Sequence, residues 1–209
     1  MVDRYRRQSP LAALHLDAQV TPDDDKSGAG VSIVERQGQR QIALRGPSTD
    51  PAFVAAIEAT LGTSLPIIPC TANGDSDGVH IMWMGPDEWL VIAPDDNDAV
   101  AENLNRACAG IHSAVVDVSE SRTIVRLSGL NARHTLSKGC SLDLHPRQFG
   151  RNKVVNTLLA QAHITLHQIS DTTDRGCEYD IYVHRSFATY LWLWFEDATR
   201  EYGLSIKSG

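Results

Sequence analysis

The sequence predicts an α+β protein in which one αβ unit occurs twice, with mixed or antiparallel sheets and helices. The first observation is an internal repeat: a strand-like run ends at Gly46 and is followed by a helical segment, and the same order recurs at Gly129, 83 positions later. The second is that short apolar runs of strand length alternate with capped helical segments. The third is size, because 209 residues with 42% hydrophobic content can bury a double unit.

These patterns divide the chain into three parts. Residues 1–30 are predicted to be an extended N-terminal arm and linker, because the segment AQVTPDDDKSGAG is rich in Asp, Gly and Ser. A first αβ unit covers 31–112 and a second covers 113–209. We expect the two units to pack intimately as one double-unit domain.

The first unit opens with two strand-like runs, VSIVER and RQIALR, whose spacing around Gly38 predicts a hairpin. A helix over 50–61 follows, with Asp50 as its N-cap and Pro51 in its first turn. A second hairpin is predicted from the runs VHIMWMG and EWLVIAP, and a second helix over 95–109.

The second unit repeats this order. It begins with two strands, SAVVDVS and RTIVRLS, joined by a short polar turn, and continues with a helix over 131–138 that ends at Gly139. Two paired strands, TLLAQ and HITLHQI, surround Ala162. A further strand, EYDIYVH, leads directly into a long final helix.

The composition of the chain excludes some classes of binding partner. The formal net charge of −7 and the pI near 5.5 argue against attraction to nucleic acid or to an anionic membrane. The N-terminus has no apolar core of signal-peptide length, and the four cysteines are far apart with no Cys-x-x-Cys pair. We therefore expect a cytoplasmic protein whose partners are small molecules or proteins.

No motif predicts a catalytic, cofactor-binding or metal-binding residue. His163 and His167 are four residues apart, but they lie in a strand-like run with no further ligand at a suitable spacing. Asp117 and Ser119 suggest a turn, because no Gly-x-Ser-x-Gly elbow accompanies them. The glycines at 28–30 precede a strand and not a helix, so they do not form a phosphate-binding loop.

The final helix carries the sharpest signal. Its segment RSFATYLWLWFEDATREYG is apolar almost all round, whereas a peripheral helix shows one apolar stripe and one polar face. We assign Trp192 and Phe195 to a second, partner-facing surface, because aromatic residues are enriched at interfaces. The alternative, that the helix is enclosed by its own domain, stays open. The side chains assigned to the core are Phe187, Tyr190, Leu191 and Trp194.

Five stretches carry a resemblance to a known family: RRQSPLAAL, GPDEWLVIAP, VVDVSESRTIVRLSG, KGCSLDLHP and YDIYVHRSFATYLWLWFEDA. In this order they resemble the gamma subunit of bacterial heterotetrameric sarcosine oxidase. That family is related in fold to the aminomethyltransferase of the glycine cleavage system, a folate-binding domain type. The aminomethyltransferases usually have a histidine where this chain has Glu120, and their catalytic aspartate has no counterpart here, which implies that folate chemistry is lost.

The resemblance implies a complex of alpha, beta, gamma and delta subunits. Such a complex oxidatively demethylates sarcosine to glycine, reduces oxygen to hydrogen peroxide, and passes the methyl carbon to tetrahydrofolate or releases it as formaldehyde. FAD and FMN are implied on or beside the beta subunit, NAD and tetrahydrofolate on the alpha subunit, and zinc on the delta subunit. This chain is implied to be an accessory subunit that binds none of them.

Within such a complex we expect two contact regions. One is the final helix through Trp192 and Phe195. The other is the basic arm, whose residues Arg4, Arg6, Arg7, Pro10 and Leu11 are expected to lie along a partner.

Two other functions stay open at this stage. One is a free-standing folate-binding or aminomethyltransferase-like protein. The other is the equivalent subunit of a related amine oxidoreductase such as N-methylglutamate dehydrogenase.

Overall fold

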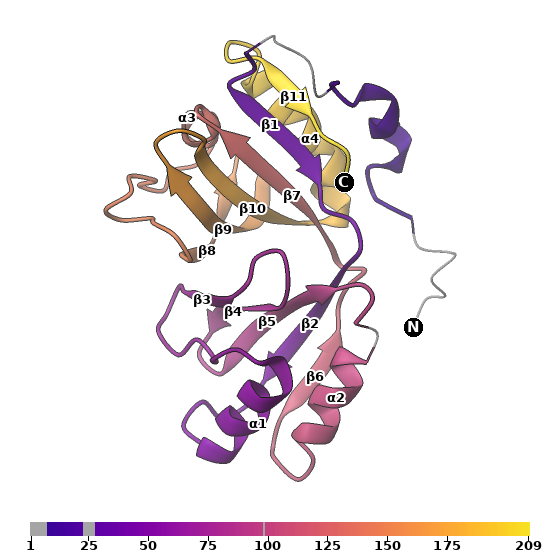
Figure 1. The fold of residues 1–209 in the computed structure, drawn as a ribbon, viewed down its shortest axis with the longest axis vertical. Helices are drawn as coiled ribbons and strands as arrows, with labels where there is room; N and C mark the ends of the chain where they lie inside the picture. Colours follow the sequence, from indigo (N-terminus) through magenta and orange to yellow (C-terminus); the bar gives the residue numbers. More distant parts are fainter. Residues whose placement is uncertain (1–7, 23–27, 98) are drawn as a thin grey trace. The chain divides into compact units, whose positions relative to one another are not determined.

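The strands form two sheets (Figure 1) in a computed structural model that describes residues 8–22, 28–97 and 99–209. The six-stranded sheet has the order β11-β1-β7-β10-β9-β8, and the five-stranded sheet has the order β3-β4-β5-β2-β6. The strands are β1 (Val31–Glu35), β2 (Gln39–Arg45), β3 (Ala72–Gly74), β4 (His80–Gly85), β5 (Glu88–Pro94), β6 (Ala114–Asp117), β7 (Arg122–Gly129), β8 (Val154–Leu159), β9 (Ala162–Thr172), β10 (Gly176–His184) and β11 (Leu204–Ile206). The helices are η2 (Ala12–Leu14), η3 (Leu16–Gln19), α1 (Pro51–Leu61), α2 (Val100–Ala107), α3 (Ala132–Ser137) and α4 (Arg185–Ala198). The predicted α+β class is confirmed.

The two compact units of the chain are not the two consecutive segments that the sequence predicted. One unit comprises the described residues up to 37 together with 121–151 and 157–209, and the other comprises 38–120 and 152–156. The boundary predicted near residue 112 does not separate them, because β1 pairs with β7 and β6 pairs with β2. Each sheet therefore takes a strand from the other half of the sequence.

The same pairings overturn two predicted connections. β1 and β2 do not form a hairpin, since they belong to different sheets, and neither do β6 and β7. Between β1 and β2, Gly38 has a φ of +67°, a left-handed conformation that glycine adopts without strain. Apolar alternation predicted the four strands correctly, but it carries no information about which strand is the neighbour.

Several local predictions are confirmed. β4 and β5 pair antiparallel as a hairpin, with Trp83 opposite Trp89. α1 is capped by Asp50, whose carboxylate accepts a hydrogen bond from the Ala52 N–H at 2.9 Å. β10 runs directly into α4.

The unit with the five-stranded sheet has its core between that sheet and the helices α1 and α2. Phe53 and Ile57 lie one turn apart on α1 and are fully buried. The Phe53 ring packs 5.8 Å from the ring of Trp89 on β5. The indole N–H of Trp89 donates to the Pro66 carbonyl at 2.8 Å, so this large side chain is buried without an unsatisfied donor.

The unit with the six-stranded sheet packs α3 and α4 against β7 and β10. Successive strand residues point to opposite faces, so the fully buried Val125 and Leu127 of β7 lie on one face and Arg126 lies on the other. Arg126 pairs across the sheet with Asp180 of β10, which places two charged residues side by side. No helix in residues 8–22, 28–97 and 99–209 combines the length and apolar content needed to cross a bilayer.

Candidate subunit-contact surface

α4 buries one side against its own unit. Its buried residues are Ala188, Leu191, Trp192, Phe195 and Ala198, which recur at helical spacing. This helix contacts β7 and β10.

Trp192 and Phe195 lie on this buried side, so their assignment to a partner-facing surface is wrong. Both have 0% of their surface exposed. The Trp192 indole N–H donates to Glu196 Oε1 at 2.9 Å, one turn along the helix. Because residues 190–195 are all apolar or aromatic, the sequence pattern does not define which side of the helix faces the sheet.

The outer side of α4 exposes Phe187, Tyr190 and Leu193, which we call the α4 surface. Their exposed fractions are 39%, 37% and 49%. No residue from 186 to 195 is charged. The exposed apolar side chains make this side of the helix a candidate contact surface.

The neighbourhood of the α4 surface holds its aromatic residues in place. The Tyr190 hydroxyl accepts a hydrogen bond from the Gln161 N–H at 3.3 Å. Trp194 is half-buried and lies against Gly139, where a Cβ atom would come 2.6 Å from Trp194 Cζ2. Phe187, Tyr190 and Trp194 were predicted to lie in the core, but Phe187 and Tyr190 are exposed.

The described part of the N-terminal arm is folded against its own chain. Leu11 has 0% of its surface exposed, so this residue belongs to the core and not to a partner contact, while Pro10 is half-buried. Ser9 Oγ donates to the buried Glu35 carboxylate at 2.6 Å, and the Arg185 guanidinium donates to the Gln8 carbonyl at 2.7 Å.

The arginines predicted to contact a partner, Arg4, Arg6 and Arg7, lie outside the described residues.

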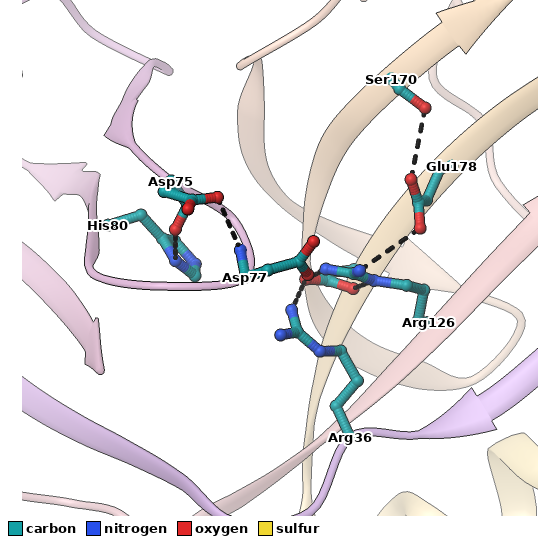
Figure 2. Close-up of polar contacts among 8 residues, drawn as sticks. Arg36, Asp75, Asp77, His80, Arg126, Ser170 and Glu178 are labelled. Atoms are coloured by element: carbon teal, nitrogen blue, oxygen red, sulfur yellow. Dashed lines mark hydrogen bonds and ion pairs between the residues drawn. The ribbon is translucent and has the colours of Figure 1, made fainter. Parts of the chain in front are cut away.

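The most highly charged buried site is an ionic cluster around Asp180, which is 0% exposed. Its carboxylate accepts from Arg36 Nη1 at 2.8 Å and from Arg126 Nε and Nη2 at 2.7 and 2.9 Å. Figure 2 shows Arg126 also directed at Glu178, with Nη1 3.3 Å from Oε1, and Glu178 bonded to Ser170. Two guanidinium groups thus face two carboxylates, an arrangement that fixes the residue after β1 to β7 and β10.

The ionic cluster was not predicted from the sequence. The available signal was charged residues inside otherwise apolar strands, Arg126 in TIVRL and Asp180 in YDIYV. Burial and the nearby Asp180 carboxylate raise the pKa of Tyr182 well above its usual range, so this phenol stays neutral.

His80 of β4 is a buried structural histidine. Its Nδ1 lies 3.1 Å from the Asp75 carbonyl oxygen (Figure 2), and the Asp75 carboxylate accepts from the Asp77 N–H at 3.0 Å. These bonds close the turn before β4.

His163 and His167 are the two histidines whose spacing suggested a metal site. His163 and His167 lie on the strand β9, as predicted. Within the part of the chain that the structure describes, no three His, Cys, Asp or Glu side chains gather as metal ligands would.

Comparison of structures defines the fold class. The aminomethyltransferase of the glycine cleavage system from Bartonella henselae superposes with a TM-score of 0.68 at 13% identity, covering 96% of this chain and 59% of that one. At this identity the likeness concerns the fold alone, and it confirms the predicted aminomethyltransferase-like architecture.

Relatives of higher sequence identity show the family to which the chain belongs. The model of the sarcosine oxidase gamma subunit family matches residues 45–201. Sarcosine oxidase subunit gamma from Corynebacterium sp. strain U-96 is 32% identical over 97% of this chain and 95% of its own length, and that from Arthrobacter sp. is 37% identical over 77% of this chain and 76% of its own length. A chain of the heterotetrameric sarcosine oxidase from Corynebacterium sp. U-96, in complex with pyrrole 2-carboxylate, has a TM-score of 0.80 at 31% identity, covering 94% of this chain and 96% of that one. The chain belongs to the sarcosine oxidase gamma subunit family, as its resemblance indicated.

Proposed function

We propose that this chain is the gamma subunit of a heterotetrameric sarcosine oxidase and that it serves as an accessory subunit, contributing contacts to the complex and no catalytic side chain. The observation that carries the proposal is the near full-length match to proteins named sarcosine oxidase subunit gamma. The complex oxidises sarcosine to glycine with oxygen, forming hydrogen peroxide and either 5,10-methylenetetrahydrofolate or formaldehyde.

The partners in this proposal are the alpha, beta and delta subunits. They carry the FAD, FMN, NAD, zinc and tetrahydrofolate sites, and this chain holds reactive centres of the other subunits in register. The proposal includes a cytoplasmic location, a reducing compartment in which the four free cysteines would stay reduced.

The α4 surface supports an accessory role. Exposed Phe187, Tyr190 and Leu193 offer apolar contact area on a helix, and aromatic residues such as Phe and Tyr are enriched at protein interfaces. The ionic cluster around Asp180 gives no comparable support for catalysis. Its carboxylate is buried and already bonded to two guanidinium groups, which leaves it poorly placed to accept a proton from a substrate.

A free-standing folate-binding or aminomethyltransferase-like protein is not favoured. The likeness to the aminomethyltransferase concerns the fold alone, whereas the gamma subunits match in both sequence and structure. An N-methylglutamate dehydrogenase subunit is not favoured either, because the family match and the curated relatives all carry the sarcosine oxidase name.

Co-expression with the other three subunits tests the proposal. A tag on this chain should capture a yellow complex of four chains that produces peroxide only when sarcosine is added. The variant Leu193→Asp should weaken capture of the other subunits, because it places a charge in the α4 surface, while Ala55→Asp on the exposed side of α1 serves as the control. Capture of no flavoprotein by the wild-type chain would refute the proposal.

A further inference from the structure

A pocket of about 540 Å³ lies at one end of the five-stranded sheet. Three short segments line it: 45–47 at the end of β2, 86–88 in the turn between β4 and β5, and 112–114 at the entry to β6. All three segments belong to the same compact unit. A volume of this order is typical of pockets that hold small molecules.

Hydrogen bonds hold two of the lining segments together. Asp87 Oδ1 accepts from the Ser48 hydroxyl at 2.6 Å and from the Ser48 N–H at 2.9 Å, and these bonds lower the pKa of the Asp87 carboxyl. The Gly46 N–H donates to the Asp87 carbonyl at 3.1 Å. Asp87 has a φ of +57°, a left-handed conformation that is uncommon for a residue with a side chain. This wall of the pocket is therefore fixed before a ligand arrives.

The pocket presents charges of both signs. Arg45 Nη2 lies 2.9 Å from Glu88 Oε1, and Asp87 adds a second carboxylate to the lining. The Arg45 and Glu88 side chains are 67% and 40% exposed, so a ligand can reach them from solvent. Asp87 bonds to Ser48 through Oδ1, which leaves Oδ2 able to accept a further hydrogen bond.

This mixture of charges favours one class of ligand. A simple anion would have to displace Glu88 from Arg45 and would then face two carboxylates, and a simple cation bound to Glu88 would leave Arg45 without its partner. A zwitterion can enter the pair with its carboxylate on Arg45 and its ammonium group on Glu88, so every charge keeps an opposite neighbour. The guanidinium fork matches a carboxylate in two parallel hydrogen bonds.

The remaining lining suits an apolar substituent next to the charged groups. Pro47, Pro86 and Ala114 contribute apolar side chains, and the two proline rings are rigid. Pockets for small molecules commonly combine an apolar wall with a few polar groups that fix the orientation of the ligand.

We propose that this pocket binds a free α-amino acid with an apolar side chain, held through its carboxylate by Arg45 and through its ammonium group by Glu88 and Asp87. The site goes beyond the proposed accessory role, because it gives this chain a small-molecule ligand of its own. The α4 surface and the Asp180 cluster belong to the other compact unit, so the pocket is separate from both.

The test is an NMR titration of the purified chain with three probes of matched shape. L-leucine carries both charges, isocaproate lacks the ammonium group, and isopentylamine lacks the carboxylate. L-leucine should cause saturable shifts of the Asp87 and Ser113 amide signals. Each of the other two probes should bind at least about tenfold more weakly, because it leaves one charge of the Arg45–Glu88 pair without a partner.

Two arginine variants locate the site. Arg45→Gln should weaken L-leucine binding by about tenfold or more. The matched control is Arg106→Gln on α2, which removes another exposed arginine from an ion pair of similar length, 2.8 Å to Glu102, and should leave binding unchanged.

Three results would overturn the pocket proposal: no saturable shift with L-leucine, equal binding of L-leucine and either singly charged probe, or equal affinity of the wild type and Arg45→Gln. None of them would affect the proposed function, which is tested separately by capture of the other subunits.

Discussion

The ionic cluster around Asp180 predicts a large effect from a small change, Asp180→Asn. This substitution preserves the size of the side chain but removes the charge that faces Arg36 and Arg126, whose side chains are only 12% and 13% exposed. Asp180 accepts three charge-assisted hydrogen bonds at 2.7 to 2.9 Å, and an amide can accept at only one of its two positions.

The expected loss in the free energy of unfolding follows from the burial of these charged groups. Breaking a buried ion pair on one side costs about 3 to 5 kcal/mol, because the remaining charge stays desolvated. The amide retains part of the bonding, so we expect a loss of about 3 kcal/mol. For a chain of this length that loss lowers the thermal midpoint by roughly 6 to 12 °C.

The matched control is Glu88→Gln. Glu88 pairs with Arg45 at 2.9 Å, a similar distance, but these side chains are 40% and 67% exposed. An exposed pair contributes about 1 kcal/mol or less. Thermal and urea unfolding of the purified chains measures both effects, and equal losses in the two variants would refute the argument that burial sets the strength of the Asp180 cluster.

Three further predictions concern the interior of the chain. Gly129→Ala should lower the free energy of unfolding, measured in urea, by more than about 2 kcal/mol, because φ is +122° and a Cβ atom would lie 2.4 Å from a backbone carbonyl oxygen. The control Gly62→Ala, with open space around it, should lose only about 1 kcal/mol. Equal losses would contradict the steric argument. Cys70 should react with iodoacetamide in the native chain at pH 8, while Cys177, whose pKa is raised by burial, should be labelled only after unfolding. Peptide mass spectrometry measures which cysteine is labelled, and labelling of Cys177 before Cys70 would contradict the prediction. Trp192→Ala should cost about 3 to 5 kcal/mol, as for a fully buried aromatic residue, and a loss below about 1 kcal/mol would restore its assignment to the surface.

The sequence predicted most secondary structure because that information is local. Asp50 and Pro51 marked the start of α1, and apolar alternation marked β4, β5, β9 and β10. The pairing of β1 with β7 could not be predicted from the sequence. The apolar alternation around Ile33 is equally compatible with a hairpin partner and with a strand far away in the sequence. Buried charges, such as Asp180, also escaped prediction because their partners are far away in the sequence.

The sequence predicted that α4 has more apolar residues than one buried side requires, but it did not predict which of them are exposed. The aromatic content of α4 correctly indicated that apolar residues exceed what one buried side requires, and Phe187 and Leu193 are exposed accordingly. The prediction of which side of α4 is buried was wrong. Trp192 and Leu193 are equally apolar neighbours, and only the packed structure distinguishes them.

The pairing of strands that lie far apart in the sequence affects the order in which the two sheets can form during synthesis. β11 pairs in parallel with β1, so β1 waits for residues 204–206 before that edge of its sheet closes. Such sequence-distant closure slows folding. The five-stranded sheet, whose strands lie between residues 39 and 117, can form before residues 204–206 are synthesised, whereas the six-stranded sheet is completed only after them.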